Sequence, residues 1–172
     1  MFGSHKTQGR EAGLATRNSF GAVSLGTSLF GFDKGFQPTH EFLRHPYVLA
    51  FSTTTIALMM NMAFKSQGWS PAMKDEFIQA AMHEFSCNDP DYNKGGWFLL
   101  MSQASTAAGF AEGKEHAEAN FFATAELISP TNADPLVVKA REAARNLPPP
   151  SDLAAGMLRV TVRKFLHATF PK

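Results

Sequence analysis

The chain has 172 residues, of which 44% are hydrophobic and 18% are charged, and its formal net charge is +1 at pH 7. This length suits one domain that buries a large core without disulfides or metals, and the composition excludes a wholly disordered chain. The balanced charge argues against nucleic acid as a partner, because nucleic-acid-binding domains usually carry a basic excess.

The sequence contains one cysteine, Cys87. A single cysteine excludes an internal disulfide and is consistent with a reducing compartment, so we expect a soluble cytoplasmic protein. The N-terminal segment combines basic, Ser and Thr residues with little acid. This composition is also found in targeting segments, which leaves an organellar matrix as the alternative location.

Residues 1–36 are rich in glycine and phenylalanine and show no sustained helical period, so we expect an extended N-terminal arm. A solvated tail would avoid large apolar side chains, since burying each one is worth roughly 1.5–3 kcal/mol. The arm therefore either lies along its own domain or inserts into a neighbouring protein. In the second case, the partner contacts would be Phe20, Leu25, Phe30, Phe32 and Phe36.

The remaining residues, 37–172, are expected to form a single helical domain. Its first helix begins after Thr39, whose hydroxyl can cap a helix N-terminus. The His45-Pro46 pair ends this short helix, because the residue before a proline is biased away from helical conformation. A second, longer helix follows directly.

Residues 46–64 carry no charge. A helix that is uncharged on every side must be surrounded by protein or by lipid. Ser, Thr and Asn residues interrupt the run, which makes it a weak membrane span. We therefore predict a buried central helix, with a membrane-associated hairpin formed by this run and residues 95–111 as the remaining alternative.

Ser70 and Pro71 mark the next helix start, with the serine as cap and the proline in the first turn. Apolar residues then recur every four positions, which predicts an amphipathic helix packed on the central one. Further helices are expected at about residues 97–111, 114–128, 134–147 and 151–170. The predicted fold is all-α: a compact bundle of about six helices around the central helix.

A loop between two of these helices places oxygen-bearing side chains at alternate positions, in Asp89, Asp91 and Asn93. This spacing resembles the opening of a calcium-binding EF-hand loop. The turn glycine comes one position late, at Gly95, and Leu100 stands where the bidentate glutamate is needed. We therefore predict a polar loop that caps backbone N–H groups, and these three residues are only weak metal candidates.

Histidines occur in pairs that supply at most half of a metal site. The pairs are His40 with His45, His83 with Cys87, and His116 with Glu112. Metal sites need three or four converging ligands, so no metal or other cofactor is predicted. Cys87 is not expected to act as a nucleophile either, because the C-terminal end of a helix disfavours the thiolate.

The last expected helix carries Arg159, Arg163 and Lys164 on its polar side. Such a basic stripe is either the solvated face of the helix or a contact for an acidic partner. No complete catalytic motif is present. We therefore expect a non-enzymatic protein-protein interaction or assembly subunit, which contacts a protein partner or a second copy through the arm and this helix.

The alternative function is a small-ligand-binding or metal-binding protein, or an enzyme, with a pocket between helices. Its lining would come from the histidines and from a methionine cluster, Met59, Met60 and Met62. Methionine side chains adapt to irregular cavities, which makes such a cluster suitable for a small molecule.

Overall fold

The computed structural model describes residues 4–24 and 38–128. Within these ranges the chain is helical and has no strand, which confirms the all-α prediction. The elements are α1 (His5–Ser24), α2 (His40–Arg44), α3 (Pro46–Leu58), the π-helical turn η1 (Met59–Ala63), α4 (Pro71–Phe85), the 3-10 segment η2 (Pro90–Gly95), α5 (Gly96–Ala104) and α6 (Phe110–Ile128). The helices expected at 134–147 and 151–170 lie outside the described residues.

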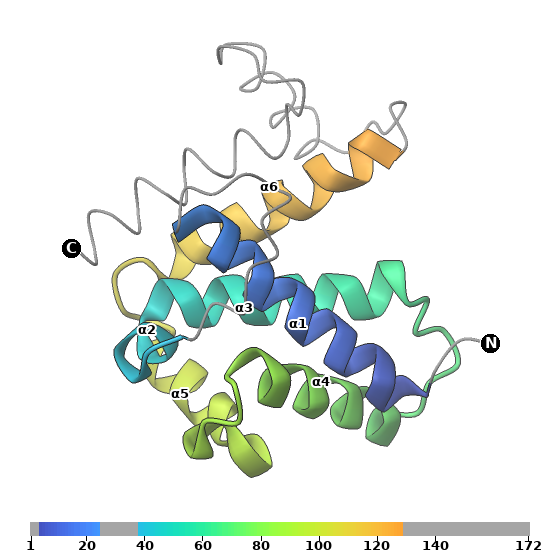
Figure 1. Ribbon diagram of the computed structural model, residues 1–172, viewed down its shortest axis with the longest axis horizontal. Coiled ribbons are helices and arrows are strands. Elements are labelled where there is room, and N and C mark those ends of the chain that lie inside the picture. Colours follow the sequence, from blue (N-terminus) through green and yellow to red (C-terminus); the bar gives the residue numbers. More distant parts are fainter. Residues whose placement is uncertain (1–3, 25–37, 129–172) are drawn as a thin grey trace.

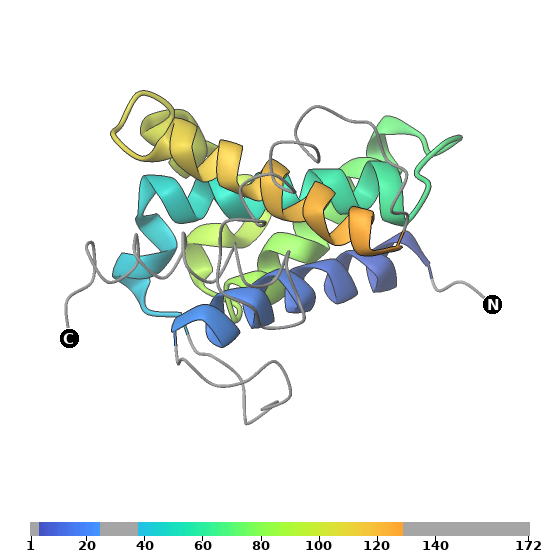
Figure 2. The same ribbon diagram turned by 90° about the horizontal axis from the view of Figure 1, so that it is seen from above.

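Two helix pairs build the bundle: α1 packs along α4, and α6 packs along α3 (Figures 1 and 2). Helix α3 contacts every other α-helix in the described part of the chain. The prediction of a central helix is therefore confirmed. None of the helices in residues 4–24 and 38–128 has both the length and the apolar character needed to cross a membrane.

Helix α3 forms the core because almost all of its surface is covered. Tyr47, Val48 and Phe51 are each at most 1% exposed. The hydroxyl of Thr53 donates to the carbonyl oxygen of Leu49 at 2.7 Å, so its polar group is satisfied within the helix. The expected range of 46–64 is correct, but the α-helix ends at Leu58 and η1 continues it to Ala63.

The helix starts predicted at Thr39 and Ser70 are confirmed by their capping hydrogen bonds, whereas the helix expected from residue 114 begins earlier, at Phe110. The backbone N–H of Phe42 donates to the Thr39 hydroxyl at 3.2 Å, and that of Met73 donates to the Ser70 hydroxyl at 3.3 Å. His45 ends α2 and also caps α3, because its ring nitrogen Nδ1 accepts from the N–H of Tyr47 at 3.3 Å. These local signals position α2, α3 and α4 as expected.

The prediction of an extended arm is wrong for residues 5–24, which form α1. Gly9 and Gly13 of this helix allow it to pack closely against another helix, and they do not mark an extended chain. A Cβ atom at Gly9 would clash with the carbonyl oxygen of Phe77, and one at Gly13 would clash with that of Ala81. The two glycines are four residues apart and so share one side of α1, which allows its backbone to approach α4 closely.

Phe20 is correspondingly a core residue and not a partner contact. Its side chain is 1% exposed. Its ring meets those of Phe51 and Phe42 edge to face, at centroid distances of 4.9 and 5.2 Å. The partner-binding role predicted for Phe20 is therefore wrong. The other predicted contacts in the arm lie outside the described residues: Leu25, Phe30, Phe32 and Phe36.

Helix α4 buries the expected apolar stripe, since Phe77, Ala81 and Phe85 are all 0% exposed. Its main partner is α1, however, and its contact with α3 is much less extensive than its contact with α1. The stripe and its contact with α3 were predicted, but the more extensive contact with α1 was not.

The expected helix at 97–111 is shorter than predicted. Helix α5 ends at Ala104, and Gly109, with φ +86°, precedes the start of α6. Gly113 thereby falls inside α6, where a Cβ atom would clash with the carbonyl oxygen of Tyr47. This glycine allows α6 to lie close to α3.

Candidate functional site

Helix α5 presents two large apolar side chains to solvent. Phe98 is 61% exposed and Leu99 is 65% exposed. Neighbouring helix positions are about 100° apart, so these two side chains share the outward side of α5. We refer to Phe98 and Leu99 as the α5 apolar surface.

The inner side of α5 holds the helix in place. Trp97, Leu100 and Met101 are partly buried against the core, and Ala104 is buried. The start of the helix also lies close against η2. A Cβ atom at Gly96 would clash with the carbonyl oxygen of Asp91 in that segment. The α5 apolar surface is therefore displayed on a well-anchored helix.

Other exposed apolar residues in the described part of the chain stand alone. Leu14 on α1 is 41% exposed, and Met62 in η1 is 47% exposed. Single exposed apolar residues are normal on any protein, whereas adjacent ones mark binding surfaces. The pairing of Phe98 with Leu99 is what distinguishes α5.

The polar loop before α5 uses its side chains to hold the fold together. Asp89 accepts from the backbone N–H of Asp91 at 2.9 Å, which confirms the predicted capping role. Its second oxygen lies 2.9 Å from Nδ1 of His40, while Asp91 pairs with Arg44. No group of three or more His, Cys, Asp or Glu residues in the described ranges is arranged to hold a metal ion.

Tyr92, at the centre of this loop, ties it to α2. Its hydroxyl donates to the carbonyl oxygen of Leu43, and its side chain is 2% exposed. Burial raises the pKa of Tyr92, and the nearby charge of Asp89 adds to this effect. The hydroxyl therefore remains a hydrogen-bond donor throughout the physiological pH range.

His83 and Cys87 do not form the half-site considered from the sequence. His83 hydrogen-bonds through Nδ1 to Oδ1 of Asn93 at 3.0 Å. The thiol of Cys87 instead accepts from Nη1 of Arg17 at 2.9 Å, and the same nitrogen donates to the carbonyl oxygen of Glu84 at 2.6 Å. This arginine joins α1 to the C-terminal end of α4.

His116 takes part in a contact between α3 and α6. Its Nδ1 atom lies 2.9 Å from the hydroxyl of Tyr47, and its Nε2 atom lies 3.9 Å from Glu112. Burial lowers the pKa of His116 below its ordinary value of 6.5, with Glu112 and Glu115 partly opposing the shift. The folded protein therefore favours neutral His116.

This lowered pKa predicts that acid destabilises the fold. The unfolded chain binds a proton at His116 more readily than the native state does, so stability is retained above pH 6.5 and falls as the pH drops below it. We expect the free energy of unfolding, measured by chemical denaturation, to decrease with acidification and to decrease less steeply in His116→Gln. His45, whose pKa is also lowered by burial, should contribute to the slope in both proteins. Identical slopes in the two proteins would contradict this role of His116.

Other candidate positions from the sequence are not brought together. Met60 is 6% exposed and Met62 is 47% exposed, so the two side chains lie in different environments. Arg159, Arg163 and Lys164 lie outside the described residues. The α5 apolar surface was missed because residues 97–101 looked like part of an interior helix. The missed signal is that large apolar residues occupy five successive positions, which places them on all sides of a short helix.

Comparison of the chain with protein-family models, curated proteins and solved structures gave no match, so the functional argument depends on the site itself.

Proposed function

We propose that this protein is a non-enzymatic assembly subunit that associates with a second copy of the same chain through the α5 apolar surface. The observation that supports this proposal is the adjacent exposure of Phe98 and Leu99, at 61% and 65%. Exposed apolar side chains that lie side by side gain free energy when a partner removes them from water.

The chemistry of α5 favours a second copy as the partner. None of its nine residues is charged, so the surface offers no ion pair to a charged partner. The cores of homodimer interfaces are more apolar than those of transient complexes, and two-fold symmetry places the same patch on both sides of the contact. The α5 apolar surfaces of two copies would therefore face one another.

The area of this surface sets the expected strength of association. A stable interface usually buries about 1,200–2,000 Å² in total, and two side chains from each copy supply only part of that. A concentration-dependent dimer is therefore expected. The other contacts predicted from the sequence are retained in the proposal as additional interface area: Leu25, Phe30, Phe32, Phe36, Arg159, Arg163 and Lys164. A cytoplasmic location, argued from the single cysteine, also remains part of the proposal.

The test is the solution mass of the full chain, measured by light scattering on a sizing column over a range of protein concentrations. The wild type should approach the mass of a dimer as the concentration rises. The double variant Phe98→Glu/Leu99→Glu should remain a monomer, because the introduced charges repel across the two-fold axis. Glutamate in the first turn of α5 is favoured by the helix dipole, so the helix should be preserved.

Leu14→Glu is the matched control, since it places the same charge at a single exposed leucine on α1. This variant should dimerise like the wild type. A wild type that is monomeric at every concentration would refute the proposed self-association. Dimerisation of the double variant at the wild-type concentration would show that α5 is not the interface.

A further inference from the structure

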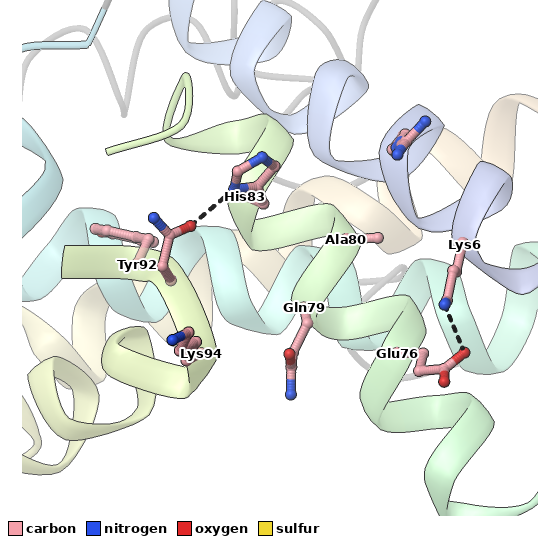
Figure 3. A pocket seen from close by; sticks show the side chains of 9 residues that line it. Lys6, Glu76, Gln79, Ala80, His83, Tyr92 and Lys94 are labelled. Atoms are coloured by element: carbon pink, nitrogen blue, oxygen red, sulfur yellow. Dashed lines mark hydrogen bonds and ion pairs between the residues drawn. The ribbon is translucent and has the colours of Figure 1, made fainter. Parts of the chain in front are cut away.

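A surface cleft of about 420 Å³ lies where α1, α4 and η2 meet. Helix α1 contributes Lys6 and Arg10, α4 contributes His83, and η2 contributes Asn93 and Lys94. Figure 3 shows Lys6 and Lys94 on opposite sides of α4, with the side chains of Gln79 and His83 on the helix between them. The volume is in the range of small-molecule sites, and neither residue of the α5 apolar surface is part of the lining.

The cleft has an excess of positive charge. Three cationic side chains, Lys6, Arg10 and Lys94, line it together with one carboxylate, Glu76. Glu76 is already bound by His5 at 2.5 Å and by Lys6 at 3.4 Å. Among the described residues, no carboxylate lies within ion-pair distance of Arg10 or Lys94. The charge of these two residues is therefore available to a ligand.

The backbone at Lys94 has a conformation that normally favours glycine. Its φ of +50° and ψ of 34° are left-handed, and Gly95 follows with a φ of +83°. A lysine in this region is strained, while glycine adopts it without steric cost. Strained residues often mark functional positions, and here the strained residue places a positive charge at the cleft.

His83 lines the cleft with a ring that is held in place. Its Nδ1 atom is hydrogen-bonded to Oδ1 of Asn93 at 3.0 Å, which fixes the orientation of the ring (Figure 3). Because an amide oxygen accepts hydrogen bonds, Nδ1 is the donor in this pair.

We infer that this cleft binds a phosphate monoester, with Arg10 and Lys94 as its charged contacts. The planar guanidinium of arginine matches two phosphate oxygens, and lysine supplies a compact positive charge. The phosphate can belong to a free small molecule or to a phosphoserine side chain. Both sources share the dianionic group that this set of donors recognises.

The test is isothermal titration calorimetry of the full chain at low salt. The probes are inorganic phosphate, glycerol 3-phosphate and a short peptide with one phosphoserine. We expect the wild type to bind phosphate and Lys94→Gly to bind it about tenfold more weakly, since a charge-assisted contact is lost. Glycine also relieves the left-handed backbone, so this variant should fold at least as well as the wild type.

Lys65→Gly is the matched control. Lys65 is also an exposed lysine with a left-handed φ, of +49°, but it does not line the cleft. This variant has the same net charge as Lys94→Gly and should retain wild-type affinity. Equal weakening in both variants would show that only the overall charge of the protein matters, and would overturn the inference. Absence of binding of all three probes to the wild type at millimolar concentrations would also overturn it.

The probes distinguish the two sources of phosphate. Tighter binding of glycerol 3-phosphate than of the peptide would assign a free phosphorylated small molecule as the ligand. Tighter binding of the peptide would assign the phosphoserine of a partner protein. Either result supports the cleft as a phosphate site, provided that Lys94→Gly weakens binding and Lys65→Gly does not.

Discussion

Replacing Phe20 with alanine is expected to lower the free energy of unfolding by about 3–5 kcal/mol, as for other buried phenylalanines. The side chain is 1% exposed and packs among the rings of Phe42, Phe51 and Phe85. Alanine would leave a cavity between α1, α3 and α4. Chemical denaturation followed by circular dichroism would measure the loss.

The matched control is Phe98→Ala, which removes the same atoms from a side chain that is 61% exposed. Its effect on the free energy of unfolding should be within about 0.5 kcal/mol, as is usual for surface substitutions. Comparable losses in the two variants would contradict the assignment of Phe98 to the surface. An unchanged stability in Phe20→Ala would instead support the exposed, partner-binding role predicted from the sequence.

Replacing Gly13 with alanine should destabilise the protein by about 1–3 kcal/mol through overpacking between α1 and α4. The added methyl group would clash with the backbone carbonyl oxygen of Ala81, which belongs to a helix and cannot move independently. The sign of the change is informative. In an exposed helix, the same substitution would stabilise by up to about 1 kcal/mol, because alanine is the better helix former.

Ala15→Gly provides the control for helix propensity, since Ala15 is exposed on the same helix. This substitution should lower the free energy of unfolding by about 1 kcal/mol, which measures the effect of helix propensity alone in α1. Denaturation of the two variants and the wild type under the same conditions would separate propensity from packing. A more stable Gly13→Ala protein would show that α1 does not pack closely against α4.

Local features of the fold could be predicted from the sequence. Thr39 and Ser70 cap helices because a hydroxyl next to the first turn is enough for this role. The uncharged run at 46–64 had to be enclosed, and α3 is enclosed. In each case the physical cause lies within a few neighbouring residues, so no knowledge of the rest of the chain is needed.

Helix α1 could not be predicted in the same way, because it is stabilised by its packing against α4, which is distant in the sequence. Glycine is a poor helix former, and the segment looks extended by propensity alone. Gly9 and Gly13 make sense only beside the carbonyl oxygens of Phe77 and Ala81, far along the chain. Their spacing of four residues was nevertheless visible in the sequence.

The candidate sites were hidden for related reasons. The exposure of Phe98 and Leu99 depends on which side of α5 the core covers, and an apolar run does not reveal that. The cleft combines residues from α1, α4 and η2, none of which carries a local phosphate-binding motif. The left-handed backbone of Lys94 was equally unpredictable, since lysine rarely adopts this conformation.

The packing of α1 against α4 also determines the order in which the chain can fold. Sixty-seven residues separate Arg17 from Glu84, its hydrogen-bond partner on α4. During synthesis, residues 5–24 leave the ribosome well before α4 exists, and a glycine-containing helix has little stability of its own. The burial site of Phe20 is therefore complete only after residues 71–85 have been synthesised, and until then the N-terminal segment exposes apolar side chains.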